Sequence, residues 1–151
     1  MLLTLNLLGD CAIIWIIKER GLDDVMTLMV SLLRKRDISI EVDTDLLEQQ
    51  VPEPHNDLFG FEVCRHTLWG HPIVQELGCE LIPSLKEMDI FAFDDDLEKL
   101  EREFLIVLNN IEVINQQTGY TREFIEFRAR NALEMIKVAC RERELVGVWI
   151  G

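Results

Sequence analysis

The chain has 151 residues, of which 48% are hydrophobic and 28% are charged, and it carries a formal net charge of −13. A chain of this length can bury a core as one domain, residues 1–151, without disulfide bonds. Its four cysteines, at positions 11, 64, 79 and 140, form no C-x-x-C pair, so we expect reduced thiols and a cytoplasmic protein. The negative charge argues against nucleic acid and anionic membranes as partners, because both would be repelled.

The first 17 residues contain thirteen apolar side chains and no Lys or Arg before Lys18. A secretory signal peptide has a basic region before its apolar run, and a membrane-spanning helix needs about 20 apolar residues, so neither is favoured. Gly9 and Asp10 separate two apolar runs, as the turn of a β-hairpin does. We interpret the segment as a hairpin, with a buried helix over about 10–20 as the alternative, because periodicity does not separate the two.

The next segment, residues 22–36, carries helix signals. Acidic residues stand at 23 and 24, basic residues at 34–36, and apolar residues recur at 25, 28, 29, 32 and 33. This order of charges suits a helix dipole, and the spacing suits an amphipathic helix, so we predict a helix over 22–36. Apolar residues then alternate with polar ones at Ile38, Ile40 and Val42, which predicts a strand.

The middle of the chain is interrupted by turn-forming residues. Three prolines and two glycines lie between residues 49 and 72, which predicts a long irregular connection, often a functional one. Within it, "LFGFEVC" indicates a short strand, and "EMDIFAF" further along indicates another.

The C-terminal part predicts two helices over about 95–116 and 121–144. Acidic residues 94–96 stand at the start of the first helix, Gly119 can end it in a left-handed conformation, and Thr121 can cap the second. The short link makes the two helices antiparallel neighbours, and "LVGVWIG" indicates a last strand. Together these elements predict an α+β fold, in which a small mixed or antiparallel sheet packs on the helix near 22–36 and on the C-terminal helical hairpin.

The second of these helices has an apolar stripe wider than one partner helix would cover. Phe124, Phe127, Met135 and Val138 widen it, so part of the hairpin should pack on the sheet or on a second subunit. We therefore expect a homo-oligomer with these four residues at its interface.

The negative charge is confined to one part of the chain. Residues 37–103 carry eighteen acidic and four basic residues, whereas residues 1–36 and 104–151 are close to neutral. Such a segment attracts a basic protein, with Glu41, Asp43 and Asp45 on one strand face as the expected partner-binding residues. Our main hypothesis is a small acidic interaction protein of the inhibitor or immunity type; the alternative interpretation of the acids is a solvated surface that keeps the protein soluble.

Enzyme motifs are scarce in the sequence. It contains no G-x-S-x-G elbow, P-loop or G-x-G-x-x-G fingerprint, so an enzyme is the less favoured class and no organic cofactor is expected. The alternative hypothesis is a zinc-binding protein or metal-dependent enzyme, because all three histidines and two cysteines fall within residues 55–79. Its candidate ligands are Cys64, His66, His71 and Cys79, although their spacing matches no known zinc motif.

Overall fold

The structure is a computed structural model that describes residues 26–151; the hairpin predicted for residues 1–17 lies outside this range. Its centre is a four-stranded sheet of order β2-β1-β4-β3 in which every neighbouring pair is antiparallel. The strands are β1 (Thr27–Arg34), β2 (Leu58–Phe61), β3 (Ile90–Ala92) and β4 (Val146–Ile150). The predicted α+β class with an antiparallel sheet is confirmed.

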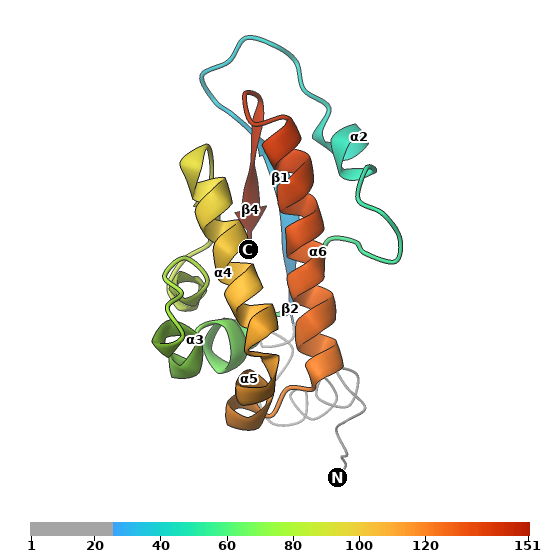
Figure 1. The fold of residues 1–151 in the computed structure, drawn as a ribbon. Coiled ribbons are helices and arrows are strands. Elements are labelled where there is room, and N and C mark those ends of the chain that lie inside the picture. Colours follow the sequence, from blue (N-terminus) through green and yellow to red (C-terminus); the bar gives the residue numbers. More distant parts are fainter. Residues whose placement is uncertain (1–25) are drawn as a thin grey trace.

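Two long helices cover one face of this sheet. They are α4 (Asp95–Asn109) and α6 (Arg122–Arg141), which lie in front of β1 and β4 in Figure 1. Shorter elements fill the connections: α2 (Thr44–Glu48), η3 (Arg65–Trp69), α3 (Pro72–Glu76), η4 (Pro83–Lys86) and α5 (Ile111–Thr118). Among the described residues, no helix is both long and apolar enough to cross a membrane.

The helix predicted over 22–36 is wrong, because residues 27–34 form the strand β1. In β1 every second side chain, Leu28, Val30 and Leu32, is buried under the helices. The apolar run satisfies a period of two as well as a helical one, and pairing with β4 along five residues decides between them. Non-local pairing thus overrides the charges that favoured a helix.

The strand predicted around Ile38, Ile40 and Val42 is also wrong. These residues lie in an irregular part of the connection after β1, and Ile40 is exposed. The guanidinium of Arg34 takes the place of a neighbouring strand, because it donates hydrogen bonds to the carbonyls of Ile38 (2.8 Å) and Ile40 (3.0 Å). Apolar and polar residues therefore alternate here although no partner strand is present, and a strand needs such a partner in order to form.

The C-terminal predictions are confirmed with one difference. Thr121 caps α6 by accepting the amide of Phe124 (3.1 Å), and Gly119 ends α5 at a φ of 84°. The single helix predicted over 95–116 is divided at Asn110 into α4 and α5. The side-chain amide of Asn110 donates to the carbonyl of Ile106 (2.8 Å), so it competes with the backbone bonds of the helix.

The core lies between the sheet and the helices and continues into the segment between β2 and β3. The rings of Phe59 and Trp69 are stacked with centroids 4.3 Å apart, and Phe104 of α4 meets Phe59 edge-on. The indole N–H of Trp69 donates to the Phe59 carbonyl (3.1 Å), so this buried donor is satisfied. This aromatic cluster packs η3, which carries Trp69, against α4, which carries Phe104.

Candidate acidic docking site

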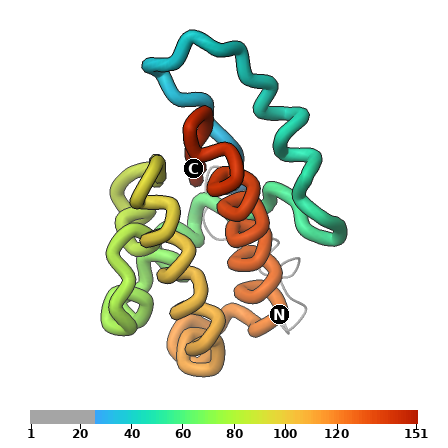
Figure 2. The backbone as a smooth tube through the Cα atoms, turned by 45° about the horizontal axis from the view of Figure 1, so that its top comes forward, coloured from blue at the N-terminus to red at the C-terminus, as the bar shows by residue number. Residues whose placement is uncertain are grey.

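The connection between β1 and β2 carries a long run of acidic residues. Between residues 37 and 57 it carries seven Asp or Glu residues and no Lys or Arg. In Figure 2 it runs as a wide arch, coloured cyan to green, outside the body of sheet and helices. We call residues 37–57 the acidic connection. The acidic connection therefore presents a negatively charged surface, and it contains no Lys or Arg that would neutralise this charge.

The helix α2 anchors the acidic connection to the sheet. Beyond its pairing with β2, the edge of β1 is open, and there the amide of Leu32 donates to the carboxylate of Glu48 (2.8 Å). The Glu48 side chain thus satisfies a backbone donor that a longer β2 would have satisfied. Asp43 begins α2 by accepting the amide of Leu46 (3.1 Å).

A second anchor lies on α6. Asn131 is fully buried, and its side-chain oxygen accepts the amide of Asn56 (3.1 Å) and lies 3.0 Å from Nδ1 of His55. Its side-chain nitrogen donates to the Leu58 carbonyl (2.8 Å). The His55 ring also stacks on Phe127. The middle and the C-terminal end of the acidic connection are therefore held in place against the sheet and α6.

An open hollow of about 340 Å³ lies beside these two anchors. Three carboxylates line it, from Asp45, Glu48 and Asp57, beside His55 and Met135. Burial raises the pKa of the Glu48 carboxyl above its ordinary value; the Leu32 amide opposes the rise, and the charges of Asp45 and Asp57 add to it. The hollow therefore favours any group that brings positive charge to it.

The structure places the predicted partner-binding residues differently from their expected strand face. Glu41, Asp43 and Asp45 are all exposed, as docking requires. Glu41 lies in the irregular part before α2, Asp43 caps α2, and of the three only Asp45 lines the hollow. Glu48 was not predicted as a member of the site; its only signal in the sequence was its place in the same acidic run.

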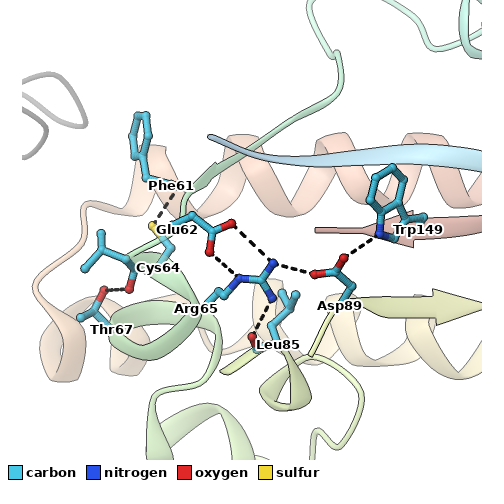
Figure 3. Close-up of polar contacts among 9 residues, drawn as sticks. Phe61, Glu62, Cys64, Arg65, Thr67, Leu85, Asp89 and Trp149 are labelled. Carbon is cyan, nitrogen blue, oxygen red and sulfur yellow. Dashed lines mark hydrogen bonds and ion pairs between the residues drawn. The ribbon is translucent and has the colours of Figure 1, made fainter. Parts of the chain in front are cut away.

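The cysteines of the predicted metal site are buried separately. The thiol of Cys64 donates to the hydroxyl of Tyr120 (3.6 Å), and that of Cys79 donates to the carbonyl of Glu103 (3.7 Å). Burial raises the pKa of both thiols, that of Cys79 to about 12 with a contribution from the Glu103 charge. In Figure 3 the sulfur of Cys64 lies beside Phe61, whose backbone amide donates a hydrogen bond to it (3.5 Å). Both cysteines are packed as small core residues.

The histidines of that predicted site also lie apart. His66 is exposed on η3, whereas His71 caps α3 by accepting the amide of Ile73 (3.0 Å). Within residues 26–151, no three His, Cys, Asp or Glu side chains are grouped so that they could hold a metal ion. The geometry thus gives the metal hypothesis no support.

The residues predicted at an oligomer interface are covered within one chain. Phe124, Met135 and Val138 are buried, and Phe127 is partly covered by His55. The helix α6 contacts β1, β2, β4 and three other helices, which accounts for its wide apolar stripe. The stripe packs on the sheet, so it no longer argues for a second subunit.

Comparisons of the chain with protein-family models, with curated proteins and with solved structures find no match.

Proposed function

We propose that this protein is an interaction protein that docks a basic protein surface on its acidic connection. The observation that carries the proposal is the hollow formed by Asp45, Glu48 and Asp57, set in a segment with seven acidic residues and no basic one. A Lys or Arg side chain of the partner would enter this hollow. Glu41 and Asp43 would contact the rim of the same partner.

Electrostatic balance supports a cation as the occupant of the hollow. The Glu48 carboxyl has a raised pKa because burial disfavours its charged form, and the negative charges of Asp45 and Asp57 add to this effect. A guanidinium or ammonium group would offset these negative charges and would form charge-assisted hydrogen bonds. The partner would therefore bind more tightly as the pH rises and Glu48 loses its proton.

The anchoring of the acidic connection also suits docking. A segment that is held by Glu48 on β1 and by Asn131 on α6 loses less conformational freedom on binding than a free loop does. The exposed acids around the hollow would attract a basic partner over about 10 Å at 0.1 M salt. The same surface thus supplies both long-range attraction and a defined contact.

The test is capture of partners from the source cell with three forms of the full chain. The first is the wild type. The second carries Glu41→Gln, Asp43→Asn and Asp45→Asn, and its change at position 43 keeps a side-chain oxygen that can still cap α2. The matched control chain carries Glu87→Gln, Glu123→Gln and Glu144→Gln, which removes the same charge from exposed sites elsewhere.

We expect one or more basic proteins to be retained by the wild type and by the control chain and to be lost from the chain with the altered acidic connection. Equal retention by all three chains, or no basic protein at low salt, would contradict the proposal. Circular dichroism of the three chains checks that each is folded.

A further inference from the structure

The second face of the sheet, opposite α4 and α6, carries a row of exposed apolar side chains. We call it the outer face. Phe91 of β3 pairs with Trp149 of β4, their rings stack at 6.4 Å, and they are 56% and 36% exposed. Met29 of β1 is 41% exposed and pairs with Leu58 of β2, which is 38% exposed. Each of the four strands therefore contributes an exposed apolar side chain to this face, and Ser31 of β1 lies opposite Trp149.

The outer face has further apolar residues near the start of β4. A Cβ atom at Gly147 would collide with the ring of Phe93, so that ring lies across the strand at this point. Leu33 of the neighbouring strand β1 is the partner of Gly147 in the sheet. Single exposed apolar residues are ordinary on a protein surface, but several of them gathered on one face of a sheet are typical of a contact surface.

Polar contacts fix the shape of this face. Arg65 bonds Asp89 (2.6 Å), and the other oxygen of Asp89 accepts the indole N–H of Trp149 (3.1 Å), as Figure 3 shows. The Trp149 ring is thereby held at a defined position and its polar atom is satisfied. What remains of the ring is an apolar surface, and no helix of residues 26–151 lies over it.

We propose that residues 1–17 of this same chain cover the outer face. Thirteen of these residues are apolar and Asp10 is the only charged one, so they match a surface that offers aromatic and aliphatic contacts. The segment is joined to β1, a central strand of the face, through residues 18–25. A second copy of the chain is the competing occupant.

The length of the link permits this arrangement. The eight residues 18–25 can span about 26 Å at about 3.3 Å each, and β1, with its eight residues, is about as long. The end of the apolar segment can therefore reach any position along β1. The link contains five charged residues, which suits a solvated connection between two apolar parts.

An intrachain segment also has the advantage of concentration over a second copy. A segment joined to its binding face by a short link has an effective concentration of about millimolar. A second copy would have to reach that concentration to compete for the same face. Coverage by residues 1–17 therefore accounts for the exposed row without an oligomer.

The experiment uses photocrosslinking in the full chain, with Phe91→p-benzoylphenylalanine at the outer face. Leu105→p-benzoylphenylalanine is the control, because Leu105 is 47% exposed on α4, away from the sheet. Mixing unlabelled and ¹⁵N-labelled protein before irradiation distinguishes crosslinks within a chain from those between chains. Met29→p-benzoylphenylalanine repeats the measurement if the Phe91 variant does not fold.

We expect the Phe91 probe to crosslink to peptides of residues 1–17 in the same chain, with a yield independent of protein concentration, and the Leu105 probe to give none of these products. Adding Ile14→Asp should lower the yield roughly tenfold, because a charge opposes burial on an apolar face. Crosslinks between chains would overturn the proposal in favour of a second copy. Absence of crosslinks to residues 1–17 from both outer-face probes would also overturn it.

Discussion

Glu103 should be among the most important polar residues for the stability of this fold. It lies on α4 and is only 4% exposed, yet it is acidic. One carboxylate oxygen accepts the amides of Glu80 and Leu81 (both 3.0 Å), and the other accepts the amide of Ile82 (2.9 Å). Three consecutive backbone donors of the segment before η4 therefore depend on this one side chain.

The change Glu103→Ala leaves these three donors without their acceptor. A hydrogen bond to a charged group contributes about 1.5–3 kcal/mol, and water can reach the amides of Glu80 and Leu81 more easily than the buried amide of Ile82. The carboxylate itself is relieved of its burial, which offsets part of the loss. We therefore expect the free energy of unfolding to fall by about 3–5 kcal/mol.

Urea unfolding followed by circular dichroism measures this loss. At a slope of about 2 kcal/mol/M, the midpoint should fall by about 2 M. Glu103→Gln should give an intermediate loss, because an amide retains one acceptor oxygen but turns a donor toward the other amides. Glu101→Ala, on the same helix, is the control. If Glu103→Ala loses no more than about 1 kcal/mol, as an ordinary surface change does, the three hydrogen bonds do not hold this segment.

Two further predictions concern ionisable groups. Because the folded pKa of Glu48 is raised above that of the unfolded chain, its contribution to stability falls as the pH rises from about 4.5 through the folded pKa. Glu48→Gln can still accept the Leu32 amide, so it should gain stability relative to the wild type between pH 4 and pH 7 in urea unfolding; an opposite trend would contradict this. Cys64 and Cys79 should react with iodoacetamide at pH 8 about 10³-fold more slowly in the folded protein than in urea, as peptide mass spectrometry measures, and comparable rates would contradict their burial.

The sequence predicted best those elements whose ends are defined locally. Thr121 lies within three residues of the amide that it caps, and Gly119 directly follows the helix that it ends. Three or four neighbouring residues are therefore enough to predict each of these helix ends. The strands β2, β3 and β4 were indicated by short apolar runs between turn residues. These features require no knowledge of distant parts of the chain.

The two wrong predictions have a common cause. Residues 27–34 carry apolar side chains that fit either a helix or a strand, and the choice is made by β4, which lies more than one hundred residues later. The residues around Ile38 and Ile40 alternate as a strand does, but Arg34 satisfies their carbonyls. A local pattern of apolar and polar residues does not show whether a distant strand or a side chain will satisfy the backbone of a segment.

The candidate site was predictable in charge but not in form. The acidic run around Asp45 is visible in the sequence, whereas its approach to Asp57 depends on α2 and on the buried Asn131 of α6. The sequence offered one signal for this contact, which is an Asn at position 131 among the apolar residues of α6. A buried Asn needs hydrogen-bond partners, and here the backbone of residues 56 and 58 supplies them.

The central claim is that the acidic connection attracts and docks a basic partner, and the association rate constant of the captured partner tests it most directly. The rate is measured at 50 mM and 300 mM salt for the wild type, for the chain with Glu41→Gln, Asp43→Asn and Asp45→Asn, and for the control chain. We predict that the rate for the wild type and the control falls steeply with salt, and that the altered chain associates about tenfold more slowly at low salt with a shallower salt dependence. Equal rates and equal salt dependence in all three chains would contradict the account.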